Sequence, residues 1–360
     1  MPDGVGEPAR PVRPPVVTSR GFVVARDEWL ALHVEEVLEP ALAIIDPHVH
    51  QYDETDGLHY LYDDLRTDLA SGHDIRATVY VQCRSFLRAD GPEEMRSVGE
   101  TEYANGVAAM AAGGRYGPTR VNAAIIGHAD LLLGDAVEDV LREHMRVADG
   151  RFKGIRQSTN FHPQIESQPE PSGRRNVAGM MADRRFRAGI STLHRLGLIF
   201  EAGCYFNQLG DVRDLARAFP ELPIVLNHFG MPLLTGPYAG RRAEVMAEWS
   251  QLIRELGSCE NVVVKLGAIG MRTLGFDFHE RAVPPSSHDI ATAMAEFTDV
   301  CIEALGPQRC MFESNFPVDR GAYSYLVFWN AAKRLAAAHS TADKRALVHD
   351  TAKRVYSIDV

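Results

Sequence analysis

The sequence of 360 residues predicts a single (β/α)₈ barrel, and three observations lead to this prediction. Short apolar runs of strand length recur along the chain, and each is followed by a longer segment with helical spacing. Polar residues stand where these runs end, which in a barrel is the mouth that carries the chemistry. The alternative, a doubly wound sheet, needs a glycine fingerprint after the first strand, but the sequence there is His48-Val49-His50-Gln51.

Strand and helix patterns alternate over most of the chain. The expected strands are at 44–50, 76–83, 120–127, 152–157, 197–205, 223–229, 261–267 and 309–315. The helical patterns lie near 61–71, 93–112, 132–148, 176–196, 208–219, 241–257 and 288–305, and two more helices are expected at 324–338 and 341–355. Residues 1–18 are rich in proline and lack apolar periodicity, which predicts a disordered or extended arm before a barrel of residues 19–360.

The composition is that of a globular protein with a small-molecule substrate. Hydrophobic residues make up 45% of the chain and charged residues 24%, which suits one large α/β domain. A formal net charge of −10 disfavours a nucleic acid or an anionic membrane as partner, because both require clustered basic surface. The five scattered cysteines include no Cys-x-x-Cys pair and predict reduced core residues. No apolar run suits a membrane span or a signal sequence, so we expect a cytoplasmic protein.

The first strand carries the most informative motif. Asp46, His48 and His50 alternate along this strand and therefore share one face. Two imidazoles at a strand end can hold a divalent ion, and the carboxylate behind them can orient a ring. We therefore expect His48 and His50 to be metal ligands. The alternative is a pair of histidines that are hydrogen-bonded within the barrel.

Polar residues at the other strand ends are candidates for substrate contact and catalysis. Arg84 and Arg156 follow the second and fourth strands, and a guanidinium grips a carboxylate with two parallel hydrogen bonds. The alternative for both is a salt bridge that ties loops at the mouth. Lys265 lies in an apolar strand and needs a buried partner, either Glu201 or Glu313. The remaining candidates at the mouth are His128, Tyr205, Asn207, His228, Arg272, Glu313 and Asn315.

Five motifs resemble, in order along the chain, the signatures of the amidohydrolase superfamily. They are Asp46-Pro47-His48-Val49-His50, Lys153-Gly154-Ile155-Arg156, Leu226-Asn227-His228-Phe229-Gly230, Val264-Lys265-Leu266-Gly267 and Met311-Phe312-Glu313-Ser314-Asn315-Phe316-Pro317. The branch with the strongest resemblance includes sugar lactonases, a sulfomuconolactone hydrolase and 2-pyrone-4,6-dicarboxylate lactonase. The resemblance implies that His48 and His50 bind a divalent metal, with Zn²⁺ expected before Mn²⁺, or polarise the substrate. It also implies that His228 is a further ligand or a catalytic residue.

This sequence departs from the family pattern at three strand ends. Gln157 and Asn207 stand where relatives commonly have His, and Asn315 stands where they have the Asp of Gly-Ser-Asp-Trp-Pro. That Asp serves as a metal ligand or general base, and a neutral amide can take neither role. Either the chemistry is altered, or Glu313 supplies the carboxylate from the same face of the strand. Glu313 is then expected to meet Lys265 on the adjacent strand or to approach the metal directly.

The sequence therefore predicts a hydrolase, with two alternatives left open. We expect metal-dependent hydrolysis of a small lactone that carries a carboxylate, with Glu313 relaying a proton and His228 and Asn315 completing the catalytic set. The expected substrate contacts are Arg84, Arg156, His128, Tyr205, Asn207 and Arg272. The alternatives are a non-hydrolytic lyase or decarboxylase on the same barrel, and a barrel that binds a ligand without catalysis. Barrels of this kind frequently pair through outer helices, so a homodimer is one expectation for the assembly.

Overall fold

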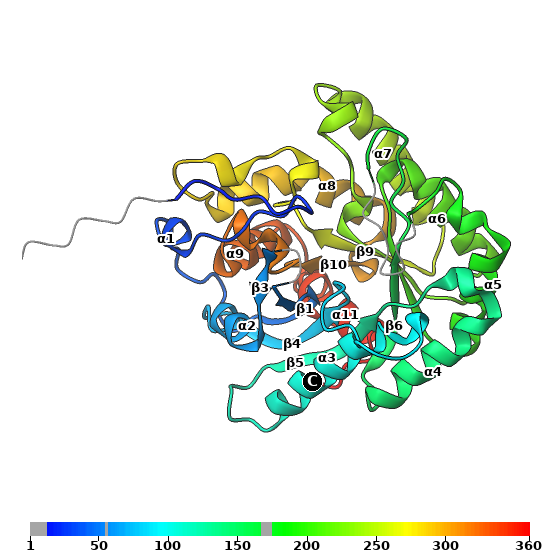
Figure 1. Cartoon of the computed structure of the whole chain (residues 1–360). Coiled ribbons are helices and arrows are strands. Elements are labelled where there is room, and N and C mark those ends of the chain that lie inside the picture. The colour runs from blue at the N-terminus through cyan, green and yellow to red at the C-terminus, as the bar shows by residue number, and fades with distance from the viewer. Residues whose placement is uncertain (1–12, 55–56, 167–174) are drawn as a thin grey trace, which may run out of the picture.

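The chain folds into a parallel barrel surrounded by helices, as the sequence predicts (Figure 1). The computed structural model describes residues 13–54, 57–166 and 175–360. Eight parallel strands follow one another around the barrel in chain order. They are β1 (Ala43–Val49), β4 (Asp74–Val81), β5 (Arg120–Gly127), β6 (Phe152–Ser158), β7 (Ile199–Gly203), β8 (Ile224–Leu226), β9 (Val262–Gly267) and β10 (Cys310–Glu313). An antiparallel pair, β2 (Tyr52–Asp53) and β3 (His59–Tyr60), follows β1.

Helices connect the strands and lie around the outside of the barrel (Figure 1). They are α2 (Tyr62–Leu69), α3 (Val98–Ala112), α4 (Val137–Val147), α5 (Arg184–Arg195), α6 (Leu209–Ala218), α7 (Arg242–Gly257), α8 (Ser287–Leu305) and α9 (Tyr325–Ala336). A short α1 (Asp27–Leu30) precedes the barrel, and α10 (Thr341–Arg345), a π-helical turn (Ala346–Asp350) and α11 (Thr351–Val355) close the chain. The predicted barrel strands and helices are thus present, although the helices expected from 93 and 176 begin only at Val98 and Arg184. Within the described residues, no helix is both long and apolar enough to cross a membrane.

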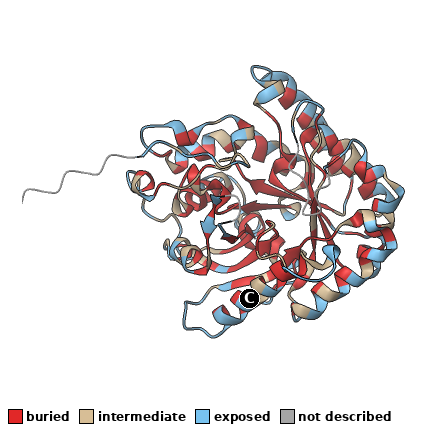
Figure 2. Ribbon diagram, viewed as in Figure 1, coloured by how far each residue is buried: buried red, intermediate tan, exposed pale blue. Residues whose placement is uncertain are grey.

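Side-chain alternation along the strands produces two apolar cores. Inward residues such as Ile45, Val79 and Val225 form a small core inside the barrel, which the C-terminal residues Tyr356 and Ile358 complete. Outward residues pack against the helices in a larger core. Figure 2 shows that the strands are buried almost throughout, while exposed residues lie on the outer helices and loops. Because apolar side chains fill the inside of the barrel, a binding site belongs at its rim.

Backbone hydrogen bonds close the barrel between its first and last strands. The amide of Asn315 donates to the carbonyl oxygen of His48 at 3.1 Å, and the amide of His50 donates to the carbonyl oxygen of Phe316 at 2.8 Å. These bonds lie at the carboxyl ends of β1 and β10. Closure therefore brings the two first-strand histidines beside Glu313 and Asn315, which come about 265 residues later in the chain.

A hairpin that the sequence did not predict precedes the barrel. Val17 forms an antiparallel bridge with Val23, and the amide of Thr18 donates to the carbonyl oxygen of Phe22 at 2.8 Å. The predicted arm of residues 1–18 falls mainly on residues 1–12, which lie outside the described residues. Its described part, 13–18, contains no helix and joins this hairpin. The division of the chain at residue 18 therefore stays a prediction.

Candidate active site

A cavity of about 180 Å³ lies at the carboxyl ends of the barrel strands. Five of the residues that the sequence predicts for the site line it. They are His50, Arg84, Arg156, His228 and Asn315. They come from five strands and meet only because the barrel is closed. The convergence of several basic and amide side chains on one cavity makes this the candidate active site.

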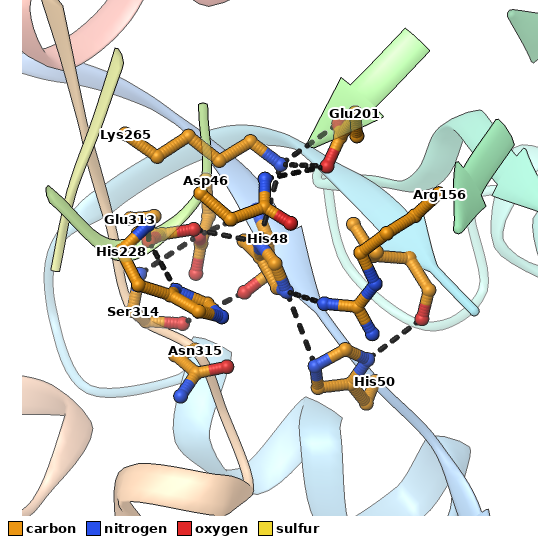
Figure 3. Close-up of polar contacts among 12 residues, drawn as sticks. Asp46, His48, His50, Arg156, Glu201, His228, Lys265, Glu313, Ser314 and Asn315 are labelled. Carbon is orange, nitrogen blue, oxygen red and sulfur yellow. Dashed lines mark hydrogen bonds and ion pairs between the residues drawn. The ribbon is translucent and has the colours of Figure 1, made fainter. Parts of the chain in front are cut away.

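Three imidazoles form the centre of the site (Figure 3). Nε2 of His48 lies 3.2 Å from Nε2 of His50, and the ring centroids of His48 and His228 are 4.8 Å apart. Burial lowers the pKa of His48 well below its usual value, and Lys265 lowers it further. Burial also lowers the pKa of His50, with Arg156 as the next cause. Both first-strand imidazoles are therefore neutral, which is the state that binds metals.

The partners of Nδ1 determine which ring nitrogen carries the proton. Nδ1 of His50 lies 2.6 Å from the carbonyl oxygen of Val81, and Nδ1 of His228 lies 2.7 Å from Oε1 of Glu313. Both partners can only accept a hydrogen bond, so Nδ1 carries the proton in each ring. Nε2 of His50 and Nε2 of His228 therefore keep their lone pairs for a ligand or a metal ion.

Glu313 lies between two of the imidazoles and is fully buried. Its Oε1 also accepts from the backbone amide of His228 at 3.1 Å, and its Oε2 lies 2.6 Å from Nδ1 of His48. Glycine at position 267 makes room for it, because a Cβ there would lie 2.5 Å from Glu313 Cγ. In the structure the carboxylate of Glu313 lies next to two histidines, whereas the sequence predicted Lys265 or a metal ion beside it.

Lys265 instead pairs with Glu201, one of the two partners that the sequence allowed. Its Nζ lies 2.9 and 2.8 Å from the two carboxylate oxygens of Glu201 and 3.1 Å from Nδ1 of His48. Glu201 also accepts from Tyr356 Oη at 2.5 Å and from Asn227 Nδ2 at 2.9 Å. Lys265 and Glu201 are fully buried. A completely partnered ion pair therefore supports the histidines from inside the barrel.

Removing only one member of this buried ion pair is expected to destabilise the protein. Lys265→Met leaves the carboxylate of Glu201 buried without its cation, which should lower the free energy of unfolding by about 3–5 kcal/mol. The measurement is equilibrium unfolding in urea. The double variant Lys265→Met, Glu201→Leu removes both charges and is the control, which should recover most of the loss. A single variant within about 1 kcal/mol of wild type would contradict the expectation, because that is the range of an exposed pair.

Asp46 does not orient a histidine ring, contrary to the expectation from the motif. One oxygen accepts from the backbone amides of His48 and Ser314, each at 3.2 Å, and the other accepts from Tyr325 Oη at 2.9 Å. Burial nevertheless raises the pKa of Asp46 to about 6. The register of β1 shifts between Asp46 and Val49, so Asp46 lies on the outer face of the strand, where its carboxylate joins β1 to the segment after β10.

Two arginines present guanidinium groups at the cavity. Arg156 Nη1 lies 3.1 Å from Nε2 of His48, and its Nη2 donates to the carbonyl oxygen of Gln82. Arg84 lies at the end of β4, where its amide and that of Cys83 donate to Oε1 of the buried Glu100 at 3.1 and 2.5 Å. Glu100 therefore shapes the loop that carries Arg84.

Four of the non-glycine lining residues have left-handed backbone conformations, namely Met231 and three residues that the sequence predicts for the site. The φ angles are +72° at Arg84, +57° at His228 and +56° at Asn315. Residues other than glycine adopt such angles at a cost of about 1–3 kcal/mol each, and they concentrate at functional sites. Tertiary contacts hold two of them in place. His228 is bonded to Glu313, and Nδ2 of Asn315 donates to Asp319 Oδ1 at 2.8 Å.

Four of the predicted substrate contacts lie outside the lining of this cavity. His128 places its Nδ1 3.3 Å from the carbonyl oxygen of Arg156, behind the rim. Tyr205 is mostly buried, and Asn207 is exposed and donates to the carbonyl oxygen of Phe161 at 3.4 Å. Arg272 lines an adjoining chamber instead. A position after a strand therefore did not suffice to predict contact with the cavity, because loop geometry turns each side chain.

The structure adds lining residues that the sequence interpretation missed. Arg20 and Phe22 reach the cavity from the N-terminal hairpin. The apolar runs 16–17 and 22–24 around Ser19-Arg20-Gly21 are a hairpin signal that could have revealed them. Asn227 also lines the cavity, and its buried Oδ1 has no hydrogen-bond partner among the described residues. Because Glu201 fixes its Nδ2, this oxygen is available to accept from a ligand.

The residues at the centre of the site fit a divalent cation. His48, His228 and Glu313 bring potential ligand atoms within 4.8 Å of one another. Oε2 of Glu313 is buried and, within the described parts of the chain, has no aligned hydrogen bond in spite of its closeness to His48. The Nε2 atoms of His48 and His50 supply a second set of donors 3.2 Å apart. A cation at these nitrogens competes with Arg156, whose guanidinium already lies beside His48.

A buried cluster of histidine and glutamate at the mouth of a (β/α)₈ barrel is the arrangement of an enzyme of the TIM-barrel class. The model of the amidohydrolase family matches residues 45–358, so the chain belongs to the amidohydrolase family. The family match begins in β1 and leaves the N-terminal hairpin outside it.

Known proteins that are similar to this chain include amidohydrolases and a lactonase. An uncharacterised protein, y4mH of Sinorhizobium fredii, is 30% identical over 88% of this chain and 99% of its own length. An L-fucono-1,5-lactonase of Burkholderia multivorans is 27% identical over 66% of this chain and 72% of its own length. Among solved structures, a zinc-bound amidohydrolase from Burkholderia multivorans has a TM-score of 0.64 at 24% identity, covering 88% of this chain and all of that one. A 2-pyrone-4,6-dicarboxylic acid hydrolase described as putative, from Pseudomonas putida, has a TM-score of 0.57 at 17% identity, covering 89% and 99%. These structural likenesses concern the fold.

Proposed function

We propose that this enzyme hydrolyses the ester bond of a small lactone that carries a carboxylate. The observation that carries the proposal is a cavity lined by two imidazoles and by arginine side chains, behind which lie a third imidazole, that of His48, and the buried carboxylate of Glu313. His48, His50 and His228 would hold a divalent ion, for which Zn²⁺ is expected and Mn²⁺ is the alternative. The L-fucono-1,5-lactonase among the relatives supports a lactone as the substrate class.

When bound, such an ion polarises a carbonyl group and lowers the pKa of water. The neutral state of His48 and His50 suits this role. Glu313 holds the proton of His228 on Nδ1 and so fixes the orientation of the ring. If His228 remains uncoordinated, the same carboxylate stabilises its doubly protonated form, which can pass a proton from Nε2 to the leaving alkoxide. Glu313 does not line the cavity, so it would act through the imidazole.

The lining residues suggest how the substrate is held. Arg84 and Arg156 supply planar guanidinium groups for the carboxylate. The buried Oδ1 of Asn227 can accept from a hydroxyl group of the substrate. Asn315 keeps its Nδ2 on Asp319, which leaves its amide oxygen as an acceptor at the cavity. The proposed substrate is thus a lactone with both an anionic group and a hydroxyl group.

Hydrolysis in ¹⁸O-labelled water tests the proposed reaction. Sugar-acid lactones with and without a carboxylate are incubated with the purified protein, and the products are analysed by mass spectrometry. A hydrolase incorporates one labelled oxygen into the product carboxylate. Release of CO₂ or of an unsaturated product without labelling would establish the lyase alternative. Ligand-induced thermal stabilisation without turnover would establish a binding protein.

Conservative replacement of the arginines should separate substrate anchoring from catalysis. In Arg84→Lys or Arg156→Lys the bidentate contact is lost, and KM for the anionic lactone should rise by about 10–100-fold. The smaller effect on kcat is expected for Arg84→Lys, because Arg156 also contacts His48. The matched control substrate is the methyl ester of the same carboxylate. Equal losses for the neutral and the anionic substrates in both variants would contradict this role.

A further inference from the structure

A second chamber adjoins the candidate active site. Its volume is about 380 Å³, and it shares Arg20, Phe22, Met271 and Val318 with the inner cavity. The N-terminal hairpin forms one side of the chamber, and the loop after β9 forms the other. The hairpin lies outside the family match, so this chamber depends on a part of the chain that the family pattern does not describe.

The hairpin is firmly attached to the barrel. Gly21 has a φ of +82°, which allows the tight turn, and Arg20 Nη1 donates to the carbonyl oxygen of Cys83 at 3.3 Å. A Cβ at Gly321 would lie 2.2 Å from the carbonyl oxygen of Val23, so the glycine lets the hairpin backbone approach. These contacts make the hairpin a fixed wall of the chamber.

The segment after the hairpin also holds the loop on the opposite side. Arg26 Nη2 donates to the carbonyl oxygen of His279 at 2.6 Å, and Trp29 Nε1 donates to that of Arg281 at 3.0 Å. Residues 270–273 and Asp277 of the same loop line the chamber. The hairpin and the loop are therefore tied together, and both sides of the chamber have defined positions.

The polar groups of the chamber favour an anion. Arg20 and Arg272 provide two guanidinium groups, whereas Asp277 is the one carboxylate among the lining residues. Arg272 has no side-chain partner in the described residues, in contrast to Arg20. Oγ1 of Thr273 is buried and likewise lacks a hydrogen-bond partner within the residues that the structure describes. An unpartnered cation and an unpartnered hydroxyl thus line the same space.

We infer that this chamber binds a second anionic group, a carboxylate at the far end of an elongated substrate whose lactone ring occupies the inner cavity. The position of the lactone ring rests on the proposed function, whereas the anion site rests on the residues that line the chamber. Arg20 and Arg272 would contact the distal carboxylate, and Thr273 would donate from Oγ1. The N-terminal hairpin would then determine substrate specificity.

Paired substrates test the inference kinetically. One is a plain δ-lactone, and the other carries a terminal carboxylate on a flexible alkyl side chain. Wild-type enzyme should prefer the second in kcat/KM, and Arg20→Gln and Arg272→Gln should each reduce that preference by about tenfold. Arg254→Gln is the matched control, because Arg254 lies on α7 and pairs with Glu303 at the surface. A preference that persists in both variants would overturn the inference.

A binding measurement keeps the test independent of turnover. Adipate, a dicarboxylate, should raise the melting temperature more than hexanoate does, and the excess should disappear in Arg272→Gln and shrink in Thr273→Val. If no lactone is hydrolysed but this pattern appears, the proposed function fails and the anion chamber stands. The chamber does not bind a distal carboxylate if adipate and hexanoate raise the melting temperature of the wild type equally. The same conclusion follows if adipate stabilises the wild type and the variants by the same amount.

Discussion

Replacing His48 and His50 together by alanine is expected to abolish both bound metal and turnover. Their Nε2 atoms are 3.2 Å apart and belong to neutral rings, so the double variant loses two converging donors. Metal content, measured by elemental analysis of protein purified without chelator, should fall from about one ion per chain to a trace. The value of kcat/KM should fall by at least about 1000-fold if the ion supplies most of the activation of water.

A variant at another buried histidine controls for loss of packing. His144 is fully buried and bonded to Thr101 Oγ1 at 2.8 Å, away from the cavity lining. His144→Ala should lower the melting temperature yet retain the metal. A double variant of His48 and His50 that still holds one ion per chain would place the metal elsewhere. The single variant His228→Ala then assigns its role, because loss of metal indicates a ligand, whereas retained metal with reduced kcat indicates a proton carrier.

Glu313→Gln is the second change for which a large effect is expected. Glutamine keeps the size of the side chain but offers only one acceptor oxygen, whereas Glu313 faces Nδ1 of His228 at 2.7 Å and Nδ1 of His48 at 2.6 Å. Where the amide nitrogen takes the place of Oε1, it meets the proton on Nδ1 of His228, which disfavours the tautomer with a free Nε2. In either orientation the negative charge beside both imidazoles is lost. We expect kcat to fall by about 100-fold or more, with metal affinity reduced by about 10–100-fold.

The cause of that loss can be separated from loss of folding. The melting temperature of Glu313→Gln is measured first, and excess Zn²⁺ is then added to saturate the site. Recovery of kcat at saturating metal would show that Glu313 acts mainly by supporting the ligands. Persistent loss at full occupancy would indicate proton handling through His228. Turnover close to that of wild type without added metal would contradict both roles.

The barrel and its first-strand motif followed from local information. Alternation of apolar residues depends only on neighbouring positions, so it predicted every strand of the barrel and placed His48 and His50 on one face. It could not predict the register shift between Asp46 and Val49, which turns Asp46 to the other face of β1. The same alternation predicted that Glu313 points inward, and the structure confirms its complete burial. The convergence of strand ends in a barrel also predicted that Arg84 and Arg156 reach one cavity.

What each side chain contacts was decided by tertiary structure. The motif predicts a histidine ring as the partner of Asp46. Barrel closure instead brings its carboxylate to the backbone amides of His48 in β1 and of Ser314 after β10. Glu313 could have met Lys265, yet Lys265 lies closer to Glu201, and the space beside Gly267 directs Glu313 to the histidines.

Tertiary structure also decided which residues of the loops and of the N-terminal hairpin reach the cavity. His128 and Asn207 end their strands much as Arg84 does, but their side chains turn away from the cavity, whereas Arg20 arrives from outside the barrel repeats. The sequence by itself thus determined the fold and the residue types at the mouth, because these depend on local periodicity, but not the face of Asp46, which a shift in strand register reverses. Only the tertiary structure decided the partners, because they come from residues far apart in the chain that strand register, loop paths and barrel closure bring together.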